Sequence, residues 1–363
     1  METLILLKNL MFFFLVILIS YIVRKKNKVS GNLQKDLSFL ITNITTPCLV
    51  ITSMAVKLTD KKIIYAKDAL IASNIIFLIS FICINIFLKF YNIKEPNRSQ
   101  MMAGGILTNL GFLGFPLIYA MYGSNGLYIA SIVNMVSNVF TYTLGLTIIK
   151  RNSEKQGKLT VRDLLNNTNI AAFCGFIILL TGFNLPEILR NVFRELGNTT
   201  GVLSMIIIGL MLGDTDIKGI FKDKHAYVMT IYRLLLLPIF LIILFKLNLL
   251  KIDSFVEKIC IILFSMPVAT IVGIFSTSYD VDPDFATKIV IMSTLFCIVS
   301  LPIILFLYNL WYNWKILILL SKQANYISSP VFFFLIFSCI KEFDNIILKY
   351  FHSIIHISIF LPH

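Results

Sequence analysis

Charged residues are scarce in this sequence. They make up only 14% of its 363 residues, whereas 57% are hydrophobic and 31 residues are phenylalanine. The mean hydropathy is +0.85. A soluble domain of this length could not hide so much apolar surface, but a lipid bilayer solvates it. The scarcity of charge therefore argues against an ordinary soluble protein and predicts an integral membrane protein.

Residues that bind metals or form disulfides are also few. Only His225 of the four histidines lies before residue 316, and the six cysteines lie singly in apolar runs without a Cys-x-x-Cys pair. Buried cysteines act as small hydrophobic residues, and zinc sites need clustered Cys and His ligands. We expect no disulfide, no metal and no cofactor. The motifs of an intramembrane enzyme, such as His-Glu-x-x-His or paired aspartates, are missing too, so we do not expect an enzyme.

The net charge of +13 raises nucleic acid as a partner, because a basic balance is typical of proteins that bind it. The Lys and Arg residues fall between the apolar runs, however, where the cytoplasmic loops of membrane proteins carry them. The expected partner is the lipid bilayer, and no nucleic acid is expected.

Apolar runs of about 20 residues, the length that spans a bilayer as a helix, recur along the chain. They do not alternate as the strands of a barrel do, so helices are expected. The ten predicted spans are residues 4–23, 37–57, 68–90, 100–120, 125–149, 166–183, 192–213, 226–247, 257–276 and 285–310.

The connections between the spans differ in charge. Lys and Arg are more numerous in the odd connections, which include RKKNK at 24–28 and KRNSEKQGKLTVRD at 150–163. The positive-inside rule places such loops in the cytoplasm. We therefore predict a multi-pass protein of the cell membrane, with its N-terminus outside and the loop 151–161 in the cytoplasm.

The long polar stretch divides the chain into two groups of five spans. Because five is odd, a duplicated unit would insert upside down, as in inverted-repeat transporters. Similar residues recur at nearly one offset: NITTP at 43–47 and GNTTG at 197–201, then GFPL at 114–117 and SMPV at 265–268. The predicted organisation is a first repeat at 1–150, a linker at 151–161, a second repeat at 162–315 and an atypical extension at 316–363.

One predicted span holds an amide, two glycines and a proline within eight residues: Asn109, Gly111, Gly114 and Pro116. Proline lacks an N–H and clashes with the carbonyl four residues earlier, here that of Phe112, and glycine lets the chain unwind. Freed backbone groups cannot face lipid. The segment is therefore predicted to be a broken helix that lines a cavity, with a simple proline kink as the alternative.

Pro267 lies at the matching place in the ninth predicted span, where it would free the carbonyl of Leu263. Two inverted broken helices would cross near the membrane centre with their half-helix N-termini pointing inward. Each N-terminus carries a partial positive charge. Such a site is predicted to favour an anion without any lysine.

The stretch NLGFLGFPL at 109–117, with the second proline in SMPVAT at 265–270, resembles the auxin efflux carrier family. That family includes bacterial carriers for malate or malonate and the plant PIN auxin exporters. The resemblance covers residues 1–315. It implies a ten-helix inverted repeat related to sodium–proton antiporters and bile-acid symporters. It also implies a scaffold domain, a transport domain, and a crossover of the broken fourth and ninth helices.

The resemblance also implies substrate-binding positions at both breaks. Asn109 and Pro116 match the family's substrate-side positions in the fourth helix, and Pro267 matches in the ninth. Cys260 stands where an amide would mirror Asn109, so the second half departs from the first. The other residues predicted to bind substrate around the two breaks are Gly111, Phe112, Gly114, Ala269 and Thr270.

Polar residues in the second and seventh predicted spans are candidates for the same cavity. Their side chains either line it or bond back to their own helix. The candidates are Asn43, Thr45 and Thr46, with Asn198, Thr199 and Thr200 as the mirror set.

Three further residues leave two readings open. Asn134 and Asn138 share one helix face, which serves either cavity lining or helix–helix contact. Arg233 lies inside a predicted span. It either contacts the substrate or extends its charge toward the basic end of the span.

These features predict a secondary transporter of a small organic anion, a carboxylate such as malate, malonate or an auxin-like acid, that works by alternating access. The alternatives are an uncoupled facilitator or channel-like permease and, behind both, an intramembrane enzyme. No interior carboxylate stands out as a coupling site. Coupling to a proton or sodium ion therefore stays open, as does a homodimer.

Overall fold

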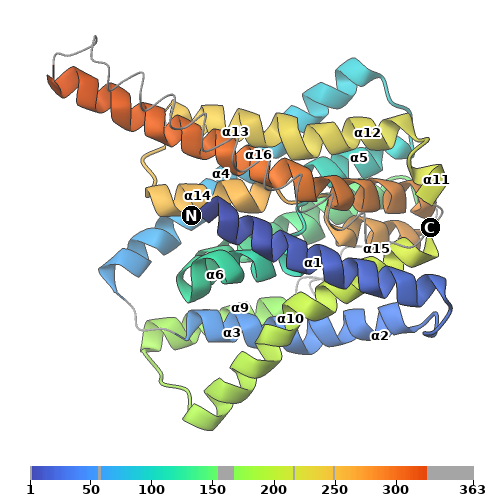
Figure 1. The fold of residues 1–363 in the computed structure, drawn as a ribbon, viewed down its shortest axis with the longest axis horizontal. Coiled ribbons are helices and arrows are strands. Elements are labelled where there is room, and N and C mark those ends of the chain that lie inside the picture. Colours follow the sequence, from blue (N-terminus) through green and yellow to red (C-terminus); the bar gives the residue numbers. More distant parts are fainter. Residues whose placement is uncertain (1, 56–58, 154–166, 216, 248–249, 325–363) are drawn as a thin grey trace. The chain divides into compact units, whose positions relative to one another are not determined.

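The computed structural model describes residues 2–55, 59–153, 167–215, 217–247 and 250–324. The elements in these ranges are all helices (Figure 1). Six helical stretches are long and apolar enough to cross a membrane: Leu33–Met54, Asp60–Tyr91, Leu110–Lys150, Glu187–Asp214, Lys224–Lys246 and Pro283–Leu310. The expected all-α membrane class is confirmed. The arrangement as ten spans in two inverted repeats stays a prediction.

The chain divides into two compact units, one of residues 9–301 and the other of residues 1–8 with 302–363. In the second unit the described residues belong to α1 (Glu2–Lys25) and α16 (Pro283–Ala324), and α16 continues past the predicted boundary at 315. Most of the predicted linker 151–161, and the extension beyond residue 324, lie outside the described residues. The candidate site lies entirely within the unit of residues 9–301.

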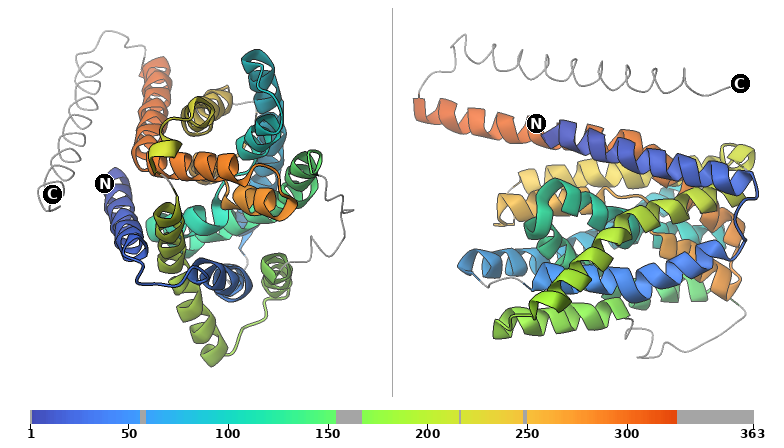
Figure 2. Two further views of the ribbon diagram at one scale, coloured as in Figure 1. Left: turned by 90° about the vertical axis from the view of Figure 1, so that its right-hand side faces the viewer. Right: turned by 60° about the horizontal axis from the view of Figure 1, so that its bottom comes forward.

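One group of helices in this unit brings distant parts of the sequence together. The helix α3 packs against α9 and α10, and α10 also contacts α2 and the π-helical turn η1 (Figure 2). Both α2 and α3 belong to one apolar stretch that η1 joins without a break. The bounds are α2 (Leu33–Leu40), η1 (Ile41–Thr45), α3 (Thr46–Met54), α9 (Asn167–Thr181) and α10 (Glu187–Asp214).

Glycines let α10 approach its neighbours closely. A Cβ atom at Gly209 would lie 2.4 Å from the carbonyl oxygen of Ile17 in α1, and one at Gly197 would lie 2.9 Å from the Cα of Leu49 in α3. Between these two glycines, Gly201 faces the ring of Pro116. Small residues allow such backbone contact between membrane helices.

A second group of helices includes α4, which packs against α5, α6 and α14. Polar side chains cap several helix starts: Asp253 accepts a hydrogen bond from the amide of Phe255 at the start of α14. The bounds are α4 (Asp60–Tyr91), α5 (Asn97–Ile106), η2 (Leu110–Gly114), α6 (Phe115–Phe140), η3 (Thr141–Gly145), α7 (Leu146–Lys150), α11 (Ile217–Ile220), α12 (Lys224–Ile231), η4 (Tyr232–Leu236), α13 (Leu237–Lys246), α14 (Ser254–Phe264) and α15 (Thr270–Tyr279).

The predicted spans 100–120 and 125–149 meet at a kink inside α6. Gly123 there has φ 59° and ψ −153°, a backbone conformation that glycine adopts far more readily than other residues. A separation predicted as a loop is thus a single glycine that redirects the helix.

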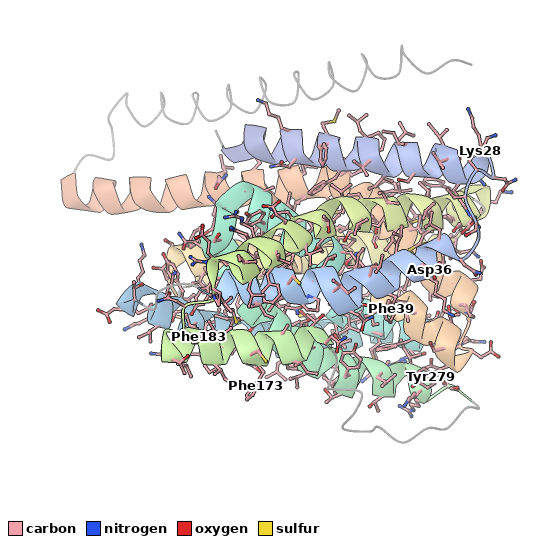
Figure 3. The ribbon with its side chains drawn as sticks, turned by 90° about the horizontal axis from the view of Figure 1, so that it is seen from below. Lys28, Asp36, Phe39, Phe173, Phe183 and Tyr279 are labelled. Atoms are coloured by element: carbon pink, nitrogen blue, oxygen red, sulfur yellow. The ribbon has the colours of Figure 1, made fainter. Side chains whose placement is uncertain are left out.

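Large apolar side chains lie exposed on the outer faces of the helices. Phe173 of α9 is 62% exposed and Phe183, just after that helix, is 58% exposed (Figure 3). Contiguous exposed apolar surface is rare on soluble proteins but is what lipid contact requires. The burial pattern therefore agrees with the membrane class.

Two short non-helical segments pair with each other in the unit of residues 9–301. Residues 107–109 separate α5 from η2, and residues 265–269 separate α14 from α15. Thr108 and Val268 form an isolated antiparallel bridge. Its two backbone hydrogen bonds run from Asn109 N–H to Pro267 O at 3.0 Å and from Ala269 N–H to Leu107 O at 3.2 Å.

The first break lies earlier than the sequence suggests. The predicted opening was the stretch from Gly111 to Pro116, but those residues form η2 and the first turn of α6. Pro116 lies just after the π-helical turn η2, in which the amide of Phe115 bonds to Leu110 O; the wider turn accommodates the proline inside a continuous helix. At the second break, the carbonyl of Leu263, predicted to be freed by Pro267, accepts a hydrogen bond from Thr108 Oγ1 at 2.7 Å.

Candidate functional site

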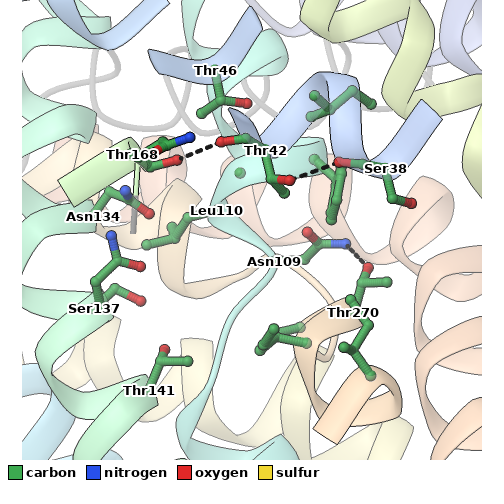
Figure 4. A pocket seen from close by; sticks show the side chains of 18 of the residues that line it. Ser38, Thr42, Thr46, Asn109, Leu110, Asn134, Ser137, Thr141, Thr168 and Thr270 are labelled. Atoms are coloured by element: carbon green, nitrogen blue, oxygen red, sulfur yellow. Dashed lines mark hydrogen bonds between the residues drawn. The ribbon is translucent and has the colours of Figure 1, made fainter. Parts of the chain in front are cut away.

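A cavity of about 420 Å³ lies beside the paired breaks (Figure 4). This volume suits a small organic molecule. Its lining residues are Ser38, Phe39, Ile41, Thr42, Asn43, Thr46, Thr108, Asn109, Leu110, Gly111, Phe112, Asn134, Ser137, Asn138, Thr141, Tyr142, Asn167, Thr168, Ala269, Thr270, Ile271 and Ile274.

Asn109 and Thr270 join the two breaks at the cavity wall. Asn109 directly precedes η2, Thr270 begins α15, and the side-chain amide of Asn109 donates to Thr270 Oγ1 at 3.1 Å (Figure 4). Both side chains are buried. The Oδ1 atom of Asn109 accepts no hydrogen bond from the described residues, which leaves an acceptor at the wall.

Two helix N-termini border the cavity. Gly111 and Phe112 lie in the first turn after one break, and Thr270 and Ile271 lie in the first turn after the other. First-turn N–H groups have no partner within their helix and carry a partial positive charge. None of the lining residues is Asp, Glu, Lys, Arg or His. The electrostatic preference of the cavity therefore comes from backbone dipoles, which favour an anion.

One wall of the cavity is a polar face of α6 and η3. Asn134, Ser137, Asn138 and Thr141 are spaced three and four residues apart, so they lie on one side of the helix (Figure 4). This face offers both donors and acceptors, because amides and hydroxyls have each. The sequence left open whether Asn134 and Asn138 line the cavity or join two helices. Both residues line the cavity.

The opposite wall is tied together by two hydrogen bonds between η1 and α9. Asn167 Nδ2 donates to Asn43 Oδ1 at 2.9 Å, and Thr168 Oγ1 donates to the carbonyl of Thr42 at 3.3 Å (Figure 4). Asn43 also bonds back to its own helix, since its amide donates to Phe39 O at 2.9 Å. Asn43 thus combines the two behaviours that the sequence left open.

Most residues predicted to bind substrate line this cavity: Asn43, Thr46, Asn109, Gly111, Phe112, Asn134, Asn138, Ala269 and Thr270. Gly114, Pro116 and Pro267 do not line it. A Cβ at Gly114 would lie 3.1 Å from the side chain of Leu263, and Pro116 packs against Gly201. Substrate binding by all of these residues stays a prediction.

The remaining candidates lie elsewhere. Thr200 donates to Thr45 Oγ1 at 2.9 Å, which joins α10 to η1, and Thr199 bonds back to Leu196 O. Neither these residues nor Asn198 lines the cavity. Arg233 is fully buried and also lies outside the lining; it donates to the carbonyls of Gly105 and Met266.

Sequence reasoning missed several lining residues, namely Ser38, Thr42, Ser137, Thr141, Tyr142, Asn167 and Thr168. Ser137 and Thr141 could have been predicted, because each lies three residues after Asn134 or Asn138 and so on the same side of the helix. The start of α9 carried no such signal, because its position beside η1 is a long-range contact.

A cavity that amides and hydroxyls help to line, beside two broken membrane helices, is the architecture of a membrane transporter. The sequence pattern of the membrane transport protein family, the auxin efflux carrier family, matches residues 5–160 and again residues 153–305. The chain belongs to this family, and the resemblance seen in the sequence is confirmed.

Two archaeal proteins are similar to the chain over most of their length. One is an uncharacterized transporter of Methanocaldococcus jannaschii, 22% identical over 299 residues that cover 80% of this chain and 96% of that protein. The other is an uncharacterized transporter of Methanothermobacter thermautotrophicus, also 22% identical over 299 residues, covering 79% of this chain and 93% of that protein. Both names agree with a transporter.

Proposed function

We propose that this protein is a secondary transporter of a small organic anion that works by alternating access. One observation carries the proposal: the cavity has no charged side chain in its lining, yet two helix N-termini border it. A carboxylate there would meet first-turn N–H groups and the amide of Asn109, without the desolvation of a buried lysine.

We further propose the ten-span inverted repeat. Each break is followed by a new helix start, at η2 and at α15, and the two breaks pair antiparallel. These observations support a duplicated unit whose copies are inverted.

The helices around the cavity suggest which parts would move. One wall comes from α2, η1, α3 and α9, and the other from the breaks, α6, η3 and α15. We assign the first group, with α10, to a scaffold and the second to a transport domain. Alternating access would then be a displacement of the second group against the first.

An uncoupled facilitator is the second candidate. It is favoured by the neutral lining, because no Asp, Glu or His there could take up a coupling proton. A coupled secondary transporter would then need residues away from the cavity to bind the proton or sodium ion. An imposed proton or sodium gradient that drives uptake beyond equilibration would contradict the facilitator.

Counterflow in proteoliposomes tests the proposed function. Vesicles loaded with an unlabelled monocarboxylate or dicarboxylate should accumulate the labelled acid transiently, because only a carrier exchanges one for the other. The uncharged amide of the same acid should not exchange. Equal exchange of acid and amide would remove the electrostatic basis of the proposal, and flux without counterflow would indicate a channel.

A further inference from the structure

Arg233 is the largest fully buried side chain of the described residues. It lies in η4, the π-helical turn between α12 and α13. Its Nε donates to Met266 O at 3.1 Å and its Nη1 to Gly105 O at 3.2 Å. Its Nη2 is buried and has no hydrogen-bond partner in the described part of the chain.

No carboxylate of the described residues pairs with this charge. The ion pairs of the described residues involve Arg24, Arg194, His225 and Lys288, and none includes Arg233. An unpaired charge inside a membrane protein is very costly. Something other than an acidic side chain must therefore balance the guanidinium.

The balance comes from two helix ends. Gly105 lies in the last turn of α5, and Met266 follows the last residue of α14 by two positions. The final carbonyls of a helix lack partners and carry a partial negative charge. One guanidinium thus binds one carbonyl at the end of α5 and one just beyond the end of α14, the two half-helices that lead into the breaks, while the N-terminal ends that leave the breaks border the cavity.

Carbonyls at the ends of broken membrane helices are the ligands that sodium takes in ion-coupled transporters. Here the same type of oxygen, from both half-helices at once, is held by a tethered cation. We propose that Arg233 is a built-in cation that fills the ion position of the crossover. On the proposed transport function, this makes the stability of the crossover, and hence solute binding, independent of sodium.

Rigidity is the second consequence. A guanidinium holds two acceptors in a fixed planar geometry, which a hydrated ion does not. Arg233 is therefore a positioning residue: it does not touch the solute, but it fixes the two half-helix ends whose continuations carry Asn109 and Thr270. Lysine could reach one carbonyl at a time without fixing their separation.

Thermal unfolding of the purified full-length protein tests this inference with the ion alone as probe. The parent protein should have the same melting temperature in sodium chloride, potassium chloride and N-methylglucamine chloride at equal ionic strength. Arg233→Ala should melt about 5–15 °C lower, and sodium should restore about 2 °C or more over potassium, because the vacated carbonyls become available to it. Arg194→Ala, which removes an exposed arginine, is the matched control and should show neither effect.

A sodium-specific rise in the parent would overturn the proposal, since a separate ion would then hold the crossover. So would an Arg233→Ala protein that is as stable as the parent, or one that is destabilised but responds equally to all three salts. If Arg233→Ala does not insert, Arg233→Lys decides. It keeps the charge and should fold without a sodium response; failure of this variant as well would show that charge is not the essential property. None of these readouts needs the solute, so they stand apart from any failure to find a transported carboxylate.

Discussion

Asn109 and Thr270 are joined side chain to side chain across 161 positions of the chain, by a hydrogen bond of 3.1 Å at the wall of the cavity. Each residue stands where the chain re-enters a helix after a break. The bond therefore links the two half-helix starts that we expect to hold the solute.

Asn109→Ala should weaken binding of a carboxylate by about 1–3 kcal/mol, the scale of a lost buried hydrogen bond. The melting temperature should change little, because water from the cavity can reach Thr270 Oγ1. Isothermal titration and thermal unfolding measure the two quantities. Asn74→Ala is the matched control: Asn74 is exposed and its amide bonds only to Leu70 O of its own helix. An unchanged affinity with a lowered melting temperature would make Asn109 purely structural.

A larger side chain should have different effects at two glycines near the first break. At Gly111 it should reduce solute affinity, and at Gly105 it should reduce stability. A Cβ at Gly111 meets nothing within 4 Å, whereas a Cβ at Gly105 would lie 2.5 Å from the side chain of Ile84. Gly111→Leu should fill part of the cavity and reduce solute affinity at least tenfold, or about 1.4 kcal/mol, with the fold intact. Gly105→Ala should destabilise the protein by about 1–3 kcal/mol through overpacking. Normal binding by Gly111→Leu would place the solute elsewhere.

Pro116→Ala should have a small effect on stability, below about 1 kcal/mol. Pro116 lies just after the π-helical turn η2, where the amide of Phe115 bonds to Leu110 O, so the wider turn already accommodates the ring and alanine adds little. Solute affinity should stay near that of the parent, because Pro116 does not line the cavity. Titration of the variant with the same carboxylate used for Asn109→Ala checks this. A loss of affinity as large as that of Asn109→Ala would contradict this and would indicate that Pro116 shapes the solute site.

The topology prediction rests on Lys and Arg in the odd connections. A cysteine placed at Arg151, which is exposed, should react with an impermeant maleimide only after the cell is permeabilised, and a cysteine placed before Glu2 should react in intact cells. The reverse labelling pattern would contradict the proposed orientation.

The sequence predicted the membrane class, the presence of two breaks and much of the cavity, because these depend on local chemistry. Apolar runs, glycines and prolines act within a few residues, and Asn109 lies beside its own break. The position of the first break was missed because a π-helical turn, η2, accommodates Pro116 inside a helix that begins at Leu110. The hydrogen bonds of Asn167 and Arg233 could not be predicted from the sequence. Their partners, Asn43, Gly105 and Met266, are brought near only by the tertiary fold.

The contact between Pro116 and Gly201 places an imino ring against a bare backbone. It joins α6, which we assign to the moving group, to α10, which we assign to the fixed one. Neither residue brings a polar side chain to the contact, and the proline has no N–H to lose. Sliding one helix along the other at this point would leave no polar group stranded in lipid. On the proposed assignment, this contact would hold the two helices at a set spacing and add no hydrogen bond that must break before they move.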